Sequence, residues 1–426
     1  MQTREHPQSP CVRNPRRELG RARRSHAAAH DGVLDAELFG HHGSEHFFDK
    51  PRNHYSSETR PKEILSTFAV SSECRQVLAR SGAQGEAPHF RLVSRGVQMR
   101  PVVRPGAVCF VLCGLWRTSE GAPIPTVMLN NGVQMPLLAA GTSGFDNETV
   151  EAAIQNATAV GYTHFHTAFD YFNLPGVGRG LARLLRGTVF VAGMTSPCIH
   201  TAAPPIRNVS DPQACYDLTR EEIRQSLSLL GIRYFDLLLL HGPSENFGYE
   251  GACNATICEL NQAQWRAYQD AADAGHARAI GVSNYCQSCL SCLLLSSPRV
   301  RPAVNQIQWH VGMGPDPERL ISFCASAGIV VQAYSPLAAG GVVSDSLCLR
   351  TAQRYNRTAA QVGLRWLVQQ QAQKPGIVVR AAAQGFLEED RGIFDWSLST
   401  TDMAALDAAT EPKGQQDGRP SWGCAK

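Results

Sequence analysis

The residues of this chain best suited to chemistry are two histidines, two tyrosines and a group of uncharged polar side chains. They are His166, Tyr171, His241, Ser283, Asn284, Gln306 and Tyr334. Histidine titrates near neutral pH and tyrosine has a pKa of about 10, so these side chains could move protons. Serine and carboxamide groups offer both hydrogen-bond donors and acceptors, which an amide-bearing ligand needs. A tyrosine ring could also fix which face of a planar ligand is exposed.

The elements that must position these residues alternate between short β-rich runs and helical patterns. The β-rich runs cover residues 137–141, 164–168, 189–193, 235–241, 279–283, 303–309, 330–334 and 377–380. Helical patterns lie between them, at residues 148–160, 177–185, 220–230, 262–274, 286–295, 317–327 and 359–370. Eight such repeats in about 300 residues predict an α/β fold, a closed (β/α)8 TIM barrel within residues 123–426. In such barrels chemistry lies at the C-terminal ends of the strands, and the seven residues fall at or just beyond those ends.

The segment before the first barrel strand predicts a hairpin. Residues 126–135 hold Asn130, Asn131 and Gly132 at their centre, and these residue types accept the positive φ angles of a tight turn. No G-x-G-x-x-G motif follows a first strand, which argues against an open dinucleotide-binding sheet.

Several motifs recur in a specific order along the barrel. They are Asn130-Asn131-Gly132 with Met135-Pro136 and Gly141-Thr142, then Leu238-Leu239-Leu240-His241-Gly242-Pro243, Ile280-Gly281-Val282-Ser283-Asn284-Tyr285, Val304-Asn305-Gln306 and Ala333-Tyr334-Ser335-Pro336-Leu337. Together they resemble the aldo-keto reductases, NADP-dependent oxidoreductases, over roughly residues 126–411. The resemblance implies a cofactor site built from Thr142, Ser283, Asn284, Gln306, Tyr334, Ser335 and Leu337. Ser283, Asn284 and Gln306 would hold the nicotinamide carboxamide. Tyr334 would stack on the ring, and Ser335 and Leu337 would meet the pyrophosphate.

Two substitutions alter the catalytic pattern of that family. Residues 161–171 resemble its second barrel strand, G-Y-x-x-x-D-T-A-x-x-Y, which carries two of the four residues of an Asp-Tyr-Lys-His tetrad. Tyr171 and His241 match the tyrosine and the histidine, but His166 stands at the aspartate position and Met194 at the lysine position. In the family's chemistry a hydride passes to a carbonyl carbon, the tyrosine protonates the oxygen, and the lysine lowers the pKa of the tyrosine.

The absence of the lysine is consistent with the absence of the aspartate, because the two would form an ion pair. The sequence has no lysine between Lys62 and Lys374, and a buried lysine without its aspartate would cost several kcal/mol. Two functions stay open. One is NAD(P)H-dependent reduction of an aldehyde or ketone, weak or altered, with Tyr171 as proton donor assisted by His241, or with His166 or His241 as a new acid. The other is a catalytically silent barrel, a pseudoenzyme that binds a nucleotide or another small ligand.

The adenosine end of the cofactor site departs further from the family pattern. The family's P-K-S-x-x-x-x-x-R-x-x-x-N run aligns with Arg380, Phe386 and Asp390 at its lysine, arginine and asparagine positions. Arg380 keeps a cation that suits a 2′-phosphate, whereas the carboxylate of Asp390 should repel one. The resemblance therefore implies NADP(H), with weakened affinity, and NAD(H) as the alternative.

Residues 1–122, which precede the barrel, predict an extension followed by a targeting segment rather than a further domain. Residues 1–98 are rich in Arg, His and Ser, which is typical of a disordered segment or of a mis-predicted extension. From Met99 to residue 122 a basic start, an apolar run and small residues are typical of a signal peptide, and the run is too short for a membrane span. If Met99 is the true start, we expect the secretory pathway, in the endoplasmic reticulum lumen or outside the cell; otherwise we expect the cytoplasm. No basic stripe with aromatics occurs, so we expect no nucleic acid. The resemblance implies a small-molecule carbonyl substrate or ligand.

Two features after residue 122 agree with secretion. Sequons for N-glycosylation occur at Asn147, Asn156, Asn208, Asn254 and Asn356. Ten of the fourteen cysteines also lie there, an even number that suggests disulfides. Cys253 and Cys258 flank a sequon in a loop rich in Gly and Asn, and we expect them to form a local bridge.

Three further cysteines share a helical pattern. Cys286, Cys289 and Cys292 are spaced by three residues, which predicts one helical face of small buried side chains. A metal site would need a fourth ligand at a suitable spacing, and the sequence offers none nearby, so no metal is expected.

Overall fold

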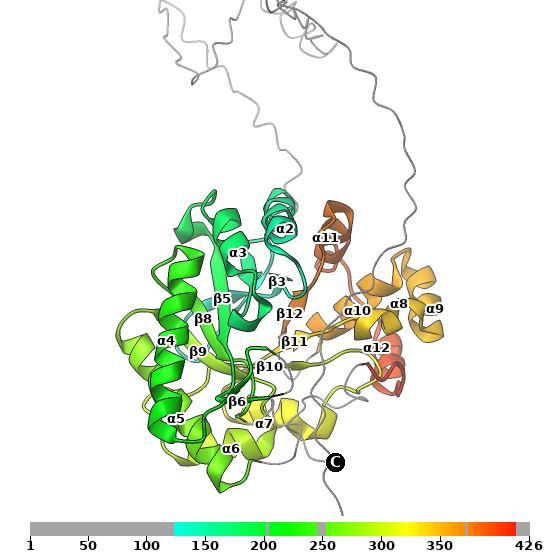
Figure 1. Ribbon diagram of the computed structural model, residues 1–426. Coiled ribbons are helices and arrows are strands. Elements are labelled where there is room, and N and C mark those ends of the chain that lie inside the picture. Colours follow the sequence, from blue (N-terminus) through cyan, green and yellow to red (C-terminus); the bar gives the residue numbers. More distant parts are fainter. Residues whose placement is uncertain (1–122, 202–203, 245–252, 371–373, 415–426) are drawn as a thin grey trace, which may run out of the picture. The chain divides into compact units, whose positions relative to one another are not determined.

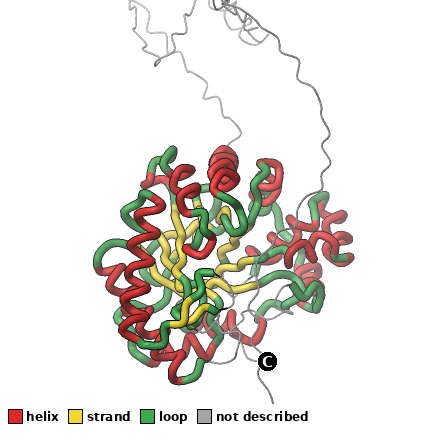
Figure 2. Tube along the Cα trace, in the orientation of Figure 1, coloured by secondary structure: helices red, strands yellow, loops and turns green. Residues whose placement is uncertain are grey.

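The computed structural model describes residues 123–201, 204–244, 253–370 and 374–414. The predicted extension at 1–98, the predicted signal peptide at 99–122 and Cys424 lie outside these residues. The described part forms the predicted (β/α)8 barrel, with eight parallel strands inside a ring of helices (Figures 1 and 2).

The eight barrel strands follow the predicted β-rich runs closely. They are β3 (Leu138–Gly141), β4 (His164–His166), β5 (Phe190–Thr195), β8 (Phe235–Leu240), β9 (Ala277–Ser283), β10 (Val304–Gln308), β11 (Val330–Tyr334) and β12 (Gly376–Val379). They lie around the ring in sequence order, and β12 closes the barrel on β3, where Ile377 pairs with Leu138. A parallel strand is covered on both faces, which is why each one reads as a short apolar run.

The helices between the strands cover the outside of the barrel. They are α2 (Asn147–Ala159), α3 (Leu174–Leu181), α4 (Pro212–Leu230), α5 (Ala255–Asp273), α6 (Gln287–Leu295), α7 (Leu320–Ser326), α8 (Gly341–Ser344), α9 (Ser346–Tyr355), α10 (Ala359–Val368), α11 (Gln384–Arg391) and α12 (Thr400–Asp407). Both α4 and α5 begin about two turns before the predicted start. The N-caps Asp211 and Asn254 explain this, since each accepts a hydrogen bond from the backbone of the first turn. Within the described residues no helix has the length and apolarity that a membrane span needs.

The predicted hairpin is present and covers the N-terminal end of the barrel. Its strands are β1 (Thr126–Met128) and β2 (Gln134–Pro136), and Gly132 in the turn has a φ of 84°. The side chains of Asn130 and Asn131 donate hydrogen bonds to the carbonyl oxygens of Pro302 and Arg278, both at 2.9 Å. These two acceptors lie at the beginnings of β10 and β9, so the hairpin is fastened across the barrel floor.

Side chains of successive strand residues alternate between the barrel interior and the helix layer. On β5, Met194 belongs to the apolar cluster inside the barrel, whereas Val191 packs in the cluster beneath the helices. Across the interior, His166 of β4, Gln306 of β10 and Gln332 of β11 are joined by hydrogen bonds. One part of the barrel interior is therefore apolar and the opposite part is polar.

The predicted bridge between Cys253 and Cys258 is wrong. The structure contains Cys253–Cys289, Cys258–Cys292 and Cys198–Cys215 instead. The reason is that α5 begins at Ala255, between the two cysteines, and that both then face α6. The expectation for the cysteines of α6 is corrected as well, because Cys289 and Cys292 are the partners in these bridges rather than small apolar side chains.

The five sequons differ in exposure. Asn208, Asn254 and Asn356 are exposed, whereas Asn147 and Asn156 are half-buried. The carboxamide of Asn156 donates a hydrogen bond to the carbonyl oxygen of Ala382, at 2.9 Å, across to the segment before α11. The structure therefore leaves three of the five asparagines well placed for a glycan, and Asn156 is the least suited.

Candidate active site

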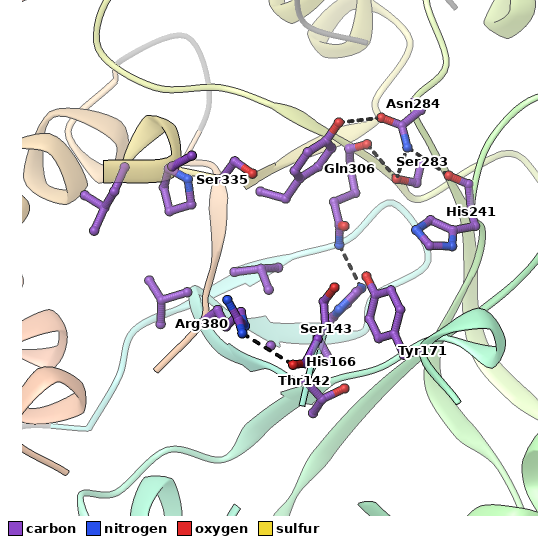
Figure 3. A pocket seen from close by; sticks show the side chains of 18 of the residues that line it. Thr142, Ser143, His166, Tyr171, His241, Ser283, Asn284, Gln306, Ser335 and Arg380 are labelled. Carbon is purple, nitrogen blue, oxygen red and sulfur yellow. Dashed lines mark hydrogen bonds between the residues drawn. The ribbon is translucent and has the colours of Figure 1, made fainter. Parts of the chain in front are cut away.

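A pocket of about 880 Å³ opens at the C-terminal ends of the barrel strands (Figure 3). It is lined by eleven of the residues that the sequence singles out, namely Thr142, His166, Tyr171, His241, Ser283, Asn284, Gln306, Tyr334, Ser335, Leu337 and Arg380. Met194 does not line it and is buried in the barrel interior. Strands β3 to β12 thus bring together residues that are up to 238 positions apart in the sequence, from Thr142 to Arg380.

Tyr171 lies on η1 (Phe169–Tyr171), a 3-10 turn that follows β4. Burial raises the pKa of Tyr171, the nearby carboxylate of Asp170 raises it further, and a hydrogen bond with Ser143 offsets this only in part. Met194 packs in the apolar cluster against which Tyr171 lies. No lysine lines the pocket, and within the described residues lysine occurs only at positions 374 and 413. The tyrosine is therefore a weaker acid than an ordinary one.

His166 has a structural partner rather than a catalytic one. Its Nε2 lies 3.0 Å from Nε2 of Gln306, which also donates a hydrogen bond to Oε1 of Gln332 at 2.7 Å. Burial, followed by the neighbouring His164 and His241, lowers the pKa of His166 to about 3. A neutral imidazole can accept the hydrogen bond from Gln306, so His166 holds that carboxamide in place and is a poor candidate for the new acid.

His241 has a carboxylate partner that the sequence interpretation missed. Its Nδ1 lies 2.8 Å from Oδ2 and 2.9 Å from Oδ1 of Asp170, whose side chain is 7% exposed. Burial opposes ionisation of Asp170, but the charge of His241 and its hydrogen bond bring the pKa of the carboxyl below its ordinary value. Asp170 directly precedes Tyr171 in the sequence. An acid beside one of the matched tetrad positions is the signal that could have pointed to this partner of His241. Asp170 follows the strand instead of lying at the inward position of the missing aspartate, so no local pattern relates it to His241.

The residues expected to bind an amide form one hydrogen-bonded set at the ends of β9, β10 and β11. The hydroxyl of Tyr334 donates to Oδ1 of Asn284 at 2.8 Å, and Nδ2 of Asn284 donates to the carbonyl oxygen of His241 at 2.9 Å. Oγ of Ser283 donates to the carbonyl oxygen of Gln306 at 2.9 Å. Both Nε2 hydrogens of Gln306 are used inside the barrel, so its side chain can offer a ligand only Oε1, an acceptor. The set is fixed in position and suits the amino group of a carboxamide.

The wall of the pocket next to β3 holds a further polar atom. Oγ1 of Thr142 is buried and has no hydrogen-bond partner within the described residues. A buried hydroxyl without a partner is costly, and a ligand that supplies one recovers that cost. Thr142 therefore fits a polar ligand group in the pocket.

The other end of the pocket carries a cation and an unusual carboxyl. Arg380, just after β12, is exposed and lies over the ring of Phe145, with 4.7 Å between the guanidinium carbon and the ring centroid. Burial, followed by the charge of Glu389, raises the pKa of Asp390 on α11 to about 7. Phe386, at the family's arginine position, is 65% exposed. Asp390 is thus only partly ionised near pH 7, and the expected repulsion of a phosphate is weaker than its residue type suggests.

Known proteins resemble this chain over the whole barrel. The family model described as "Aldo/keto reductase family" matches residues 137–411. "Uncharacterized oxidoreductase YtbE" of Bacillus subtilis is 31% identical over 287 residues, which cover 66% of this chain and 92% of that protein. "Glyoxal reductase" of the same bacterium is 30% identical over 292 residues, again 66% of this chain and 92% of that protein. The crystal structure of a Bombyx mori aldo-keto reductase in complex with NADP is 25% identical, with a TM-score of 0.55, over 71% of this chain and 99% of that one.

Proposed function

Because this chain belongs to the aldo/keto reductase family, a family of oxidoreductases, we propose that it reduces the carbonyl group of a small aldehyde or ketone with NADPH. The observation that carries the proposal is the pocket itself. It brings Ser283, Asn284 and Gln306 together with Tyr171 and His241, at the strand ends where barrel enzymes do their chemistry. The similarity to a glyoxal reductase and to an NADP-bound relative supports a carbonyl substrate and this cofactor.

The residues of the pocket fit a nicotinamide cofactor. Ser283, Asn284 and Gln306 would hold the carboxamide, Tyr334 would lie against the ring, and Arg380 would meet a phosphate. When bound, the cofactor supplies the hydride. The chain's own residues then fix the ring, exclude water from the strand ends and provide the proton for the carbonyl oxygen.

A second function is favoured by one specific observation. The pKa of Tyr171 is raised, and Met194 fills the position from which the family's lysine would lower it. A barrel of this kind could bind the nucleotide without turnover. The two functions share the cofactor and differ only in the chemical step.

NADPH binding and turnover separate these functions. Purified protein is titrated with NADPH while nicotinamide fluorescence is followed, and aldehydes and ketones are then added while NADPH oxidation is measured. We expect saturable binding and slow turnover. Gln306→Leu should weaken binding about tenfold, because it removes the acceptor for the carboxamide and the hydrogen bond to His166.

The matched control is Gln308→Leu, on the same strand and fully buried, but outside the pocket lining. It should leave NADPH affinity unchanged in folded protein. Binding without turnover of any carbonyl would favour the silent barrel. A chain that binds neither NADPH nor NADH would contradict both functions.

The carboxyl of Asp390 predicts a pH-dependent stability. Its pKa in the folded chain is about 7, above an unfolded value of about 3.9, so the folded state binds more protons between these values. Its contribution is therefore most favourable below pH ~4 and is lost as the pH rises through about 7. Asp390→Asn should stabilise the chain above pH 7, by at most about 1.4 kcal/mol per unit of pKa shift, and change little near pH 4. Urea unfolding across this pH range measures the difference, and a difference that does not vary with pH would contradict the assignment.

The same structure bears on where the chain works. We also propose that it matures in the secretory pathway. Three disulfide bridges support this, since such bridges persist in oxidising compartments and are rare in the cytosol. The exposed sequons at Asn208, Asn254 and Asn356 are compatible with it.

A further inference from the structure

We propose that Asp170 and His241 form an acid–base pair, in which the His241 imidazolium gives the proton to the carbonyl oxygen and Asp170 positions it. This inference rests on the proposed carbonyl reduction and deepens it. In the family the proton donor is a tyrosine whose pKa is lowered by a lysine. Here the proposed donor is a histidine whose ring is positioned by a carboxylate. In these terms His241 is a catalytic residue, and Asp170 acts through it.

The contacts of the pair define its geometry. Both carboxylate oxygens of Asp170 lie within 2.9 Å of Nδ1 of His241, so Nδ1–H donates to the carboxylate. Nε2, on the opposite side of the ring, is then the nitrogen that meets a substrate in the pocket that His241 lines. A carboxylate on one imidazole nitrogen fixes the ring orientation and stabilises the imidazolium, the arrangement of many general acid–base histidines. Figure 3 shows His241 and Tyr171 on the same side of the pocket.

The same carboxylate acts in opposite directions on the two proton donors. The ring centroids of Tyr171 and His241 are 5.6 Å apart, so both rings border the place where a carbonyl oxygen would lie. The carboxylate of Asp170 orients the His241 ring through Nδ1, whereas its negative charge raises the pKa of Tyr171 and so opposes release of the tyrosine proton. In place of a lysine that would counter this, the chain has Met194. The charges around the site therefore favour His241 as the acid.

Other titratable groups around the pair do not change this assignment. His200 of β6 (Ile199–His200) lines the same pocket, and burial lowers its pKa, so it is mainly neutral. Glu222 of α4 forms an ion pair with Arg207. His166, on the far side of Tyr171, is neutral and hydrogen-bonded to Gln306.

The proposed reduction transfers one hydride and one proton to the carbonyl group. Hydride adds to the carbonyl carbon and forms the new C–H bond, while the π electrons of C=O move to the oxygen. The oxygen takes the proton from Nε2 of His241, whose N–H bond breaks and leaves its electron pair on the nitrogen. The carbonyl is reduced to an alcohol by the two electrons of the hydride, which the nicotinamide supplies. The neutral imidazole regains a proton from water before the next turnover.

Asp170→Asn tests the pair with two readouts. The first is 15N NMR of the histidine rings in the protein without cofactor, with the His241 signal identified by its loss in His241→Gln. The wild-type ring should carry hydrogen on Nδ1. In Asp170→Asn the carboxamide can donate to Nδ1, so we expect the hydrogen to move to Nε2. The second is turnover, where kcat should fall by about 10²- to 10⁴-fold while NADPH affinity stays within about twofold.

A matched control and a double variant keep the test decisive. Asp146→Asn makes the same change at the N-cap of α2, where asparagine caps equally well, and should alter neither readout. Asp170→Asn combined with His241→Gln leaves no buried unpaired charge, and should be no slower than His241→Gln alone. The pair would be overturned if kcat were unchanged in Asp170→Asn. It would also be overturned if Tyr171→Phe abolished turnover while Asp170→Asn and His241→Gln did not. Either result would leave the proposed carbonyl reduction intact. If the wild-type chain turns over no carbonyl, the proposed function fails and the acid role fails with it.

Discussion

Met194→Lys is expected to destabilise the folded barrel by about 3–5 kcal/mol, because it buries an ammonium that has no partner. Met194 is 2% exposed and belongs to the apolar cluster inside the barrel. Its position is the one that carries lysine in the family, yet the aspartate that would compensate the charge is His166 here. Because burial lowers the pKa of His166 to about 3, this side chain stays neutral and cannot take the place of that aspartate. Urea unfolding of the two proteins measures the loss.

His166→Asp in the same chain should recover most of the loss. In the register of β4 and β5, His166 lies opposite Ala192, so position 194 is a diagonal neighbour on the same interior face. The expected coupling energy between the two substitutions is about 3 kcal/mol, measured as a double-mutant cycle. Met135→Lys is the control, since Met135 is equally buried in the same cluster but lies on the hairpin. Additive effects, or an equal rescue of Met135→Lys, would show that positions 166 and 194 do not form a pair.

The double substitution also bears on catalysis. An ammonium paired with a carboxylate beside Tyr171 would lower the pKa of the phenol, which is raised in this chain. Proton donation could then come from the tyrosine, and turnover would depend less on Asp170.

The barrel and most of the pocket could be predicted because they follow from local patterns. An apolar run such as 235–241 becomes a strand because both of its faces are covered, and a parallel barrel places all strand ends at one rim. Ser283, Gln306 and Tyr334 therefore come together without any knowledge of side-chain contacts. The seven-residue shift at the start of α5 shows the limit of periodicity, because the cap at Asn254 set that boundary.

The contacts that could not be predicted are those between side chains that no local pattern relates. Asp170 and His241 are 71 residues apart, and their contact depends on how η1 turns after β4. A carboxylate just outside a strand could equally have faced solvent. The role of His166 was hidden for a similar reason, since Gln306 lies 140 residues away across the barrel interior.

Reduction of the bridges between α5 and α6 is expected to cost about 4 kcal/mol of folding stability for the first bridge, and less for the second. Cys253–Cys289 and Cys258–Cys292 close loops of 36 and 34 residues, so each one restricts the unfolded chain. The second bridge adds less because the first has already closed nearly the same loop. Unfolding in denaturant with and without a reductant measures the loss in a chain that carries Cys198→Ser and Cys215→Ser, because the third bridge is then absent in both conditions. Peptide mapping without reductant identifies the pairs.

The variant Cys258→Ser with Cys292→Ser should lose part of the response to reductant, because one bridge is absent in either condition. Cys324→Ser is the control, since Cys324 is a buried thiol outside every bridge, and it should keep the full response. Equal stability with and without reductant would contradict both the bridges and the proposal that the chain matures in an oxidising compartment.

The bridges should also affect the cofactor site. Helix α6 begins at Gln287, three residues after Asn284, and Cys289 and Cys292 tie this first part of the helix to the start of α5. Loosening it should allow Asn284 to leave its hydrogen bonds with Tyr334 and with the backbone of His241. Reduced protein should therefore bind NADPH more weakly. Bound NADPH should in turn slow reduction of the bridges, because a ligand that binds the ordered site stabilises the conformation in which α6 is held against α5. If NADPH affinity is the same in reduced and oxidised protein that remains folded, then the bridges stabilise the barrel without positioning its cofactor site.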